Sequence, residues 1–142
     1  MRKQKELLER AVSILERGFG PNDVEVAKAL ISLGNACGAL GDAKTQVEHL
    51  ERALCINEAG FGPDHVETAV ALRNLGNAYG ALGDAEQREA LLERAVSINE
   101  AAFGPQHLEV AHSIIDLSHA CGELGDRHMQ KELLIRALRI LE

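Results

Sequence analysis

The sequence predicts an all-α fold of helix-turn-helix repeats stacked in a right-handed α-solenoid, with seven helices and no strands. First, Phe-Gly-Pro occurs at residues 19–21, 61–63 and 103–105, so the chain repeats every 42 residues. Second, Leu-Gly-Asp recurs at residues 40–42, 82–84 and 124–126 and divides each unit into two halves. Third, apolar residues within each half follow the three- and four-residue spacing of a helical face. A fixed period of this length is typical of stacked repeats.

The composition agrees with closely packed helices. Of the 142 residues, 46% are hydrophobic, 3% are aromatic and 26% are charged. A core with so few aromatic side chains must be filled by leucine, isoleucine, valine and alanine, which suits helices better than a sandwich of sheets. A chain of this length predicts one domain.

The period also gives the domain organisation, a single repeat array over residues 1–142. Residues 1–18 are expected to form the second helix of a partial repeat; residues 19–60, 61–102 and 103–142 are units with a loop, a first helix and a second helix. Both ends fall inside the pattern, because Leu8-Glu9-Arg10-Ala11 matches Leu50-Glu51-Arg52-Ala53. Since solenoids normally end in atypical repeats, we expect a piece of a longer array whose terminal helices can associate end to end.

The helices are expected at residues 2–17, 23–39, 43–59, 65–81, 85–101, 107–123 and 127–141. The first range takes its assignment from its match to residues 43–60. In residues 23–39 one helical face carries Val26, Leu30, Leu33, Cys37 and Leu40. In residues 43–59 the corresponding face carries Val47, Leu50, Ala53, Leu54 and Ile56. The remaining ranges repeat these two patterns.

The first helix of each unit begins at a predicted capping box. Asn22-x-x-Glu25 and Asp64-x-x-Glu67 have the required form, in which the cap side chain accepts a hydrogen bond from a backbone amide of the first turn. Gln106-x-x-Glu109 is a weaker version. We therefore expect Asn22, Asp64 and Gln106 to cap these helices.

The Leu-Gly-Asp and Phe-Gly-Pro segments are the expected helix breaks. Glycine at residues 41, 83 and 125 lies where a helix ends with positive φ. The aspartates that follow, Asp42, Asp84 and Asp126, are expected to cap the second helices. Phe-Gly-Pro ends each second helix, because the residue before a proline is driven out of the α region.

Charge and cysteine content argue against several function classes. The net charge of −7 repels nucleic acids and anionic lipid surfaces. The first residues carry no apolar stretch of a signal peptide, and the sequence contains no apolar run long enough for a membrane span. Three cysteines without CxxC spacing indicate neither a disulfide framework nor a zinc knuckle. A cytoplasmic protein with reduced thiols is the expectation.

One group of segments resembles a known family. The sequence Asn74-Leu75-Gly76-Asn77-Ala78-Tyr79, followed by Leu-Gly-Asp at 82–84 and by Arg94-Ala95-Val96, is similar to tetratricopeptide repeats. The loop at residues 62–69 resembles that of the 42-residue variant found in kinesin light chain. The resemblance implies a non-enzymatic adaptor that holds a peptide or helix in a concave groove lined by the first helix of each pair.

The chain departs from the family where the two helices of a repeat approach each other. The family prefers alanine on the second helix at this point, whereas the aligned residues are Gln4, Gln46, Arg88 and Gln130. The family often has a large side chain on the first helix where this chain has Gly38, Gly80 and Gly122. We expect these glycines to make room for the larger residues.

The resemblance also implies which residues line the groove. The candidates are Lys28, Ser32, Asn35, Arg73, Asn74, Asn77, His112, Asp116, His119 and Glu123. Asn35 and Asn77 match the asparagine that hydrogen-bonds a ligand in peptide-binding members of the family. The alternative is that Asn35 and Asn77 bond their neighbours along the stack. Cations that would clamp a carboxylate are missing at Ile31, His112 and Asp116.

Other chemistry is weakly indicated. His112, Asp116, His119 and Glu123 form one helical stripe, but a single helix cannot close a tetrahedral zinc site, so a solvated face is the simpler interpretation. No catalytic or cofactor motif is present, and we expect no enzyme activity, cofactor or metal. Arginine recurs in all four second helices, as Arg10, Arg52, Arg94 and Arg136, and we expect these arginines to form an inter-repeat ladder with Glu9, Glu51 and Glu93.

Two functions remain open. The first is a scaffold that binds a protein or peptide in its concave groove, without contacts to nucleic acid or membrane. The second is a structural spacer or self-associating array without a dedicated ligand. Groove positions differ between units, as at Lys28, Val70 and His112, and this divergence favours binding.

Overall fold

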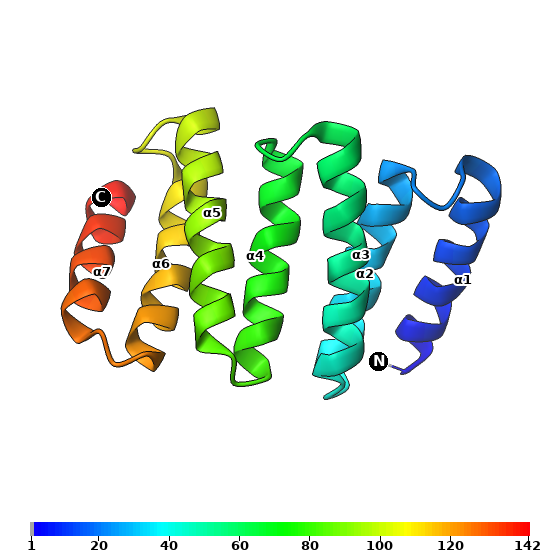
Figure 1. Cartoon of the computed structure of the whole chain (residues 1–142), viewed down its shortest axis with the longest axis horizontal. Helices are drawn as coiled ribbons and strands as arrows, with labels where there is room; N and C mark the ends of the chain where they lie inside the picture. The colour runs from blue at the N-terminus through cyan, green and yellow to red at the C-terminus, as the bar shows by residue number, and fades with distance from the viewer. Residues whose placement is uncertain (1) are drawn as a thin grey trace.

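The computed structural model describes residues 2–142, and these residues form seven α-helices and no strand. The helices are α1 (Arg2–Phe19), α2 (Val24–Ala39), α3 (Ala43–Phe61), α4 (Val66–Ala81), α5 (Ala85–Phe103), α6 (Leu108–Glu123) and α7 (Arg127–Leu141). They follow one another along the long axis, from α1 at one end to α7 at the other (Figure 1). The predicted all-α solenoid is confirmed, and every expected boundary lies within two residues of the observed one. No described helix is long and apolar enough to cross a bilayer.

The first helices begin one residue later than the predicted capping boxes. The side chains of Asp23, His65 and His107, not those of Asn22, Asp64 and Gln106, accept hydrogen bonds from first-turn amides. The prediction was wrong because the turn after Phe-Gly-Pro continues one residue further. His65, with φ −87° and ψ 150°, is the last residue with the extended backbone of a cap.

The two histidine caps are held by aromatic stacking. The imidazole of His65 lies 4.6 Å from the ring of Phe61, and the imidazole of His107 lies 4.5 Å from the ring of Phe103, measured between centroids. The Phe-Gly-Pro segment therefore ends one helix and also fixes the cap of the next.

The second helices begin and end as the sequence predicts, with a small extension. Asp42, Asp84 and Asp126 accept hydrogen bonds from the amides of Thr45, Gln87 and Met129, and the glycine before each aspartate has a φ of 84° to 86°. Helices α3 and α5 continue to Phe61 and Phe103, two residues beyond the expected ends. Each stops only at the next glycine, whose φ is 99° or 90° and lies outside the range that other residues adopt readily.

Where the two helices of a repeat meet, the first helix carries glycine and the second helix carries a larger side chain, as expected. A Cβ atom built on Gly80 would lie 2.7 Å from Cδ of Arg88, and one on Gly122 would lie 2.6 Å from Nε2 of Gln130. Gly38 is filled in the same way by Gln46. Glycine on the first helix therefore provides the volume that the larger side chain on the second helix requires.

The core runs along the array, and the first helices lie closer to one another than the second helices do. The largest fully buried side chains include Leu30, Leu50, Leu72, Leu92 and Ile114, which come from α2 to α6. Cα atoms of α2 and α4, and of α4 and α6, approach within 8 Å, whereas within residues 2–142 no second helix comes this close to another. The first helices α2, α4 and α6 therefore line the inner side of the curve.

An arginine ladder joins consecutive second helices, with partners other than those expected. Arg52 pairs with Glu16 at 2.7 Å, Arg94 with Glu58 at 2.8 Å and Arg136 with Glu100 at 3.1 Å. The expected partners Glu9, Glu51 and Glu93 make none of these bonds. Each of them directly precedes an arginine, and residues one apart do not share a helix face. Glu51, for example, accepts a hydrogen bond from the Tyr79 hydroxyl.

Candidate functional site

All groove candidates lie on the three neighbouring first helices and none of them is buried. Helix α2 carries Lys28, Ser32 and Asn35, helix α4 carries Arg73, Asn74 and Asn77, and helix α6 carries His112, Asp116, His119 and Glu123. Because α2, α4 and α6 lie side by side, these side chains share one surface, which we call the inner face.

Several candidates are brought together across the inner face. The Asn35 amide donates from Nδ2 to Oδ1 of Asn74 at 3.2 Å, and Asn74 in turn donates to the backbone carbonyl of Val70 at 2.8 Å. Arg73 forms an ion pair with Asp116, whose side chain is 19% exposed. These bonds connect α2 to α4 and α4 to α6, so part of the inner face is a polar seam between repeats.

A second-helix residue completes this seam. Arg88 of α5 pairs with Glu123 and donates a hydrogen bond of 3.4 Å to Oδ1 of Asn77, while its buried Nε has no hydrogen-bond partner. Sequence reasoning placed Arg88 only at the contact between helices. The positive charge of Arg88 was the signal that it could also form an ion pair, because the aligned positions in the other second helices carry glutamine.

The other candidates do not meet one another in this way. Lys28 pairs with Glu25 of its own helix at 3.4 Å. His119 lines a shallow cavity of about 390 Å³ between α6 and α7, together with Arg88 and Arg127. Within residues 2–142, no three histidine, cysteine or acidic side chains are placed to hold a metal ion. On α6 the two acidic residues of the predicted stripe are used in ion pairs, Asp116 with Arg73 and Glu123 with Arg88.

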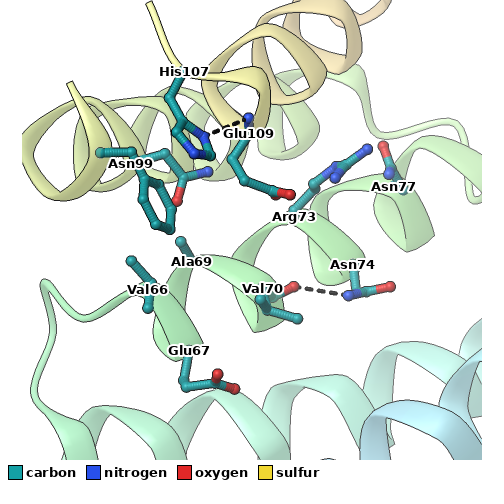
Figure 2. A pocket seen from close by; sticks show the side chains of 11 residues that line it. Val66, Glu67, Ala69, Val70, Arg73, Asn74, Asn77, Asn99, His107 and Glu109 are labelled. Carbon is teal, nitrogen blue, oxygen red and sulfur yellow. Dashed lines mark hydrogen bonds between the residues drawn. The ribbon is translucent and has the colours of Figure 1, made fainter. Parts of the chain in front are cut away.

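The inner face opens into a larger cavity of about 720 Å³ between α4, the end of α5 and the start of α6 (Figure 2). Arg73, Asn74 and Asn77 are the three candidates that line it. The remaining lining residues are Val66, Glu67, Ala69, Val70, Asn99, Phe103, His107 and Glu109. The sequence did not predict that Phe103 and His107, at the two ends of a Phe-Gly-Pro loop, line the cavity. The available signal was that this loop recurs directly before each first helix.

The cavity has an apolar end and a polar end. Val70 is 45% exposed and Phe103 is 42% exposed, so each presents apolar surface to a ligand. Toward the polar end lie Arg73 and the exposed amide of Asn77, and Figure 2 shows the side chain of Glu109 extending toward Arg73. A ligand that fits here combines an apolar side chain with hydrogen-bonding groups.

Comparison with known proteins finds a family match for part of the chain. A family model described as tetratricopeptide repeat matches residues 46–101. No curated protein sequence matches the chain.

Solved structures match nearly the whole chain. BtubC (BKLC) from P. vanneervenii is 22% identical with a TM-score of 0.89, over 96% of this chain and 54% of that one. The "nearly identical TPR-like repeats" of a putative kinesin light chain from Podosopora anserina are 26% identical with a TM-score of 0.81, over 99% of this chain and 66% of that one. MamA is 20% identical with a TM-score of 0.63, over 96% of this chain and 77% of that one. The chain thus spans about half the length of the first structure and about two thirds of the second.

Proposed function

Because the repeats of this chain are tetratricopeptide-like and similar to those of a kinesin light chain, we propose that the protein is a non-enzymatic interaction scaffold. It binds a peptide or helix of a protein partner on the inner face. The observation that carries this proposal is the cavity of about 720 Å³, which is lined by exposed Val70 and Phe103 and by the amides of Asn74 and Asn77.

The chemistry of the cavity suits a peptide. An apolar side chain of the ligand fits against Val70 and Phe103, where its burial is favourable. The amide of Asn77 can donate and accept hydrogen bonds at once, as an extended peptide backbone requires. Arg73 is already paired with Asp116, so this lining side chain is held in place before a ligand arrives.

A displayed library of random peptides, selected against the protein, tests this function. Val70→Glu places a charge at the apolar end and is expected to weaken the selected peptides at least tenfold, and Asn77→Ala by about tenfold through a lost hydrogen bond. Ser97→Glu, on an exposed position of α5, is the matched control and should leave affinity unchanged. Peptides that bind Val70→Glu as tightly as the unaltered protein would exclude the cavity as their site.

The polar seam supports the second candidate function, a structural spacer or self-associating array. Three pairs of side chains bond to each other across the repeats, which leaves fewer polar groups for a ligand: Asn35 with Asn74, Arg73 with Asp116, and Arg88 with Glu123. In a spacer, Arg73→Glu lowers the melting temperature without changing the affinity for any partner. End-to-end association through the terminal helices then appears as filaments by light scattering, without added ligand.

We also propose a cytoplasmic location, without contacts to nucleic acid or membrane. The net charge of −7 supports the second part. The three free cysteines support the first, since reduced thiols are typical of that compartment. Reaction of Cys55 with a thiol reagent in freshly lysed cells would test it, because this residue is exposed.

A further inference from the structure

The cavity between α4, α5 and α6 contains a buried hydrogen-bond acceptor. Asn99 of α5 lines this cavity and is only 7% exposed. Its Nδ2 atom donates to the hydroxyl of Ser113 at 2.8 Å, and this hydroxyl donates in turn to the backbone carbonyl of Glu109 at 3.1 Å. Because a hydroxyl has one proton to donate, the Asn99 amide must meet it with its NH2 group. The Oδ1 atom of Asn99 is therefore directed away from Ser113.

This Oδ1 atom reaches the cavity and has no donor of its own. The bond to Ser113 is the one side-chain hydrogen bond that Asn99 makes within residues 2–142. In the same part of the chain, Nε of Arg88 is the one fully buried side-chain polar atom without a partner, so Oδ1 is not sealed off. Figure 2 shows it pointing toward Ala69 of α4. Since most buried polar side-chain atoms have a partner, a ligand that donates here fits the site.

The walls beside this acceptor are apolar. Val66, Ala69 and Val70 line the cavity from α4, and Phe103 lines it from the end of α5. A wholly apolar ligand side chain would cover Oδ1 without donating to it, which weakens binding. The cavity therefore favours a ligand side chain with an apolar stem and a donor at its tip.

The charges on the lining favour a cationic donor. Glu67 of α4 and Glu109 of α6 both line the cavity, and neither forms an ion pair within the described chain. Among the lining residues, Arg73 is the one lysine or arginine, and it is already paired with Asp116. A ligand cation would thus meet two carboxylates that lack a basic partner.

The first unit shows how the chain satisfies the same glutamate by itself. Glu25, Glu67 and Glu109 occupy one position in three consecutive units. On α2, Lys28 follows Glu25 by three residues and pairs with it at 3.4 Å. On α4 the residue aligned with Lys28 is Val70, so Glu67 has no such lysine. The second unit therefore offers the carboxylate of this pair to an ammonium group from elsewhere.

We propose that the ligand of the cavity is a peptide anchored by a lysine. This inference rests on the proposed function and names the side chain that the cavity binds. The four-carbon stem of the lysine packs against Val70 and Phe103, and its ammonium group donates to Oδ1 of Asn99. Glu67 and Glu109 balance its charge. Arginine fits less well, because its planar group suits paired acceptors and Oδ1 is a single one.

Displayed peptide libraries that differ at one fixed position test the anchor. The central residue is lysine in the first library, methionine in the second and glutamate in the third, and all other positions are random. The lysine library should yield the tightest peptides. Replacing their central lysine by norleucine, which has the same stem without the ammonium group, should weaken binding about tenfold.

Variants of the protein locate the ammonium group. Val70→Lys copies Lys28 and places an ammonium group of the chain beside Glu67, so lysine peptides should bind at least tenfold more weakly. Glu67→Gln and Glu109→Gln should each weaken lysine peptides about threefold and leave norleucine peptides unchanged. Glu25→Gln is the matched control, because Glu25 is paired with Lys28 and does not line the cavity.

Asn99→Ala tests the acceptor directly. It should weaken a lysine peptide about as much as norleucine does, and the two changes together should cost little more than either alone. Equal effects of Asn99→Ala on the lysine and norleucine peptides would exclude Oδ1 as the partner of the ammonium group. If this variant does not fold, Val70→Lys decides, since Val70 is 45% exposed and can be replaced without disturbing the core.

The failure of the lysine anchor can be told apart from the failure of the proposed function. Peptides that weaken in Asn77→Ala but come equally from the methionine or glutamate library, or that tolerate norleucine, would overturn the lysine anchor and leave the cavity as a peptide site. If no library yields a peptide that depends on Asn77, both the proposed function and the lysine anchor are wrong.

Discussion

The Nδ1 atom of His107 accepts a hydrogen bond from the backbone amide of Glu109 at 3.1 Å. His65 makes the same bond to Glu67 at 3.0 Å, and in the first unit Asp23 takes this place with a bond of 2.9 Å to Glu25. Two of the three caps are therefore made by an imidazole nitrogen, and the third is made by a carboxylate oxygen.

Loss of the histidine caps is expected to lower the stability of the fold. His65→Ala and His107→Ala each remove the side-chain acceptor of a first-turn amide, and each should cost about 1 kcal/mol of unfolding free energy in urea titrations. The variant His65→Asp/His107→Asp copies Asp23 and should retain most of this stability.

Acidification is expected to destabilise the fold through His49. Burial lowers the pKa of His49 below its ordinary value. A depressed histidine pKa removes stability as the pH falls, because the unfolded chain takes up the proton first. His49→Gln should therefore lose less stability than the unaltered protein as the pH falls through the range where histidine titrates. Equal losses of stability in the two proteins, measured by urea titration, would show that His49 does not contribute.

Gly80→Ala is expected to destabilise the fold by about 1 kcal/mol. The new methyl group would displace Arg88, and overpacking costs about 1–3 kcal/mol, of which better helix propensity offsets about 1 kcal/mol. In Gly80→Ala/Arg88→Ala the collision is absent, so the double variant should be more stable than the sum of the single effects by about 1 kcal/mol. Gly122→Ala is the control, because it meets only the flexible amide of Gln130.

Arg94→Lys is expected to destabilise the array by up to about 1 kcal/mol. Arg94 donates both bonds from Nη2, to Glu58 at 2.8 Å and to the carbonyl of Pro63 at 3.0 Å, and the shorter lysine side chain does not bring its ammonium group to the same point. The effect stays small because both side chains are about a third exposed. Arg10 makes no such bond within the described chain, so Arg10→Lys should change the unfolding free energy by about 0.5 kcal/mol or less.

Tyr79 is expected to titrate late and in isolation, since the chain has one tyrosine and no tryptophan. The hydrogen bond to Glu51 raises the pKa of Tyr79 to about 12, with burial as the second cause. Glu51→Gln should bring this pKa back toward the ordinary value of about 10, as followed by phenolate absorbance.

The sign of the effect on stability follows from the raised pKa of Tyr79. Because the proton is held more tightly in the folded state, the stabilisation is complete below about pH 10. It is lost as the pH rises through about 12. A Tyr79 pKa that is the same in Glu51→Gln and the unaltered protein would rule out the hydrogen bond as its cause.

The helices could be predicted from sequence because glycine and proline end them and aspartate caps them at positions that recur in each unit. The packing of Arg88 against Gly80 was also predictable. Gly80 is smaller than the residue that the family often has at its position, and Arg88 is larger than the alanine that the family prefers, so the two changes in side-chain volume compensate. The cap at His107 was missed because histidine is not among the preferred cap residues. Its role depends on the stacked ring of Phe103, a tertiary contact.

Less of the candidate site could be predicted. An alignment to the first helices places Arg73 and Asn77 on the inner face, but it does not show that Arg73 pairs with Asp116. Arg88 and Phe103 reach the same region from a second helix and its final turn. These residues reach the site only because neighbouring units stack on each other. The spacing of residues within one unit does not predict such contacts.

The arginine ladder makes the number of units adjustable. Arg52 pairs with Glu16, Arg94 with Glu58 and Arg136 with Glu100, and the two residues of every pair are 36 positions apart. Because each bond joins neighbouring units only, duplication or deletion of one complete 42-residue unit leaves each remaining arginine with a glutamate at the same separation. A product lengthened or shortened by whole units therefore keeps its arginine ladder without a compensating substitution in these pairs.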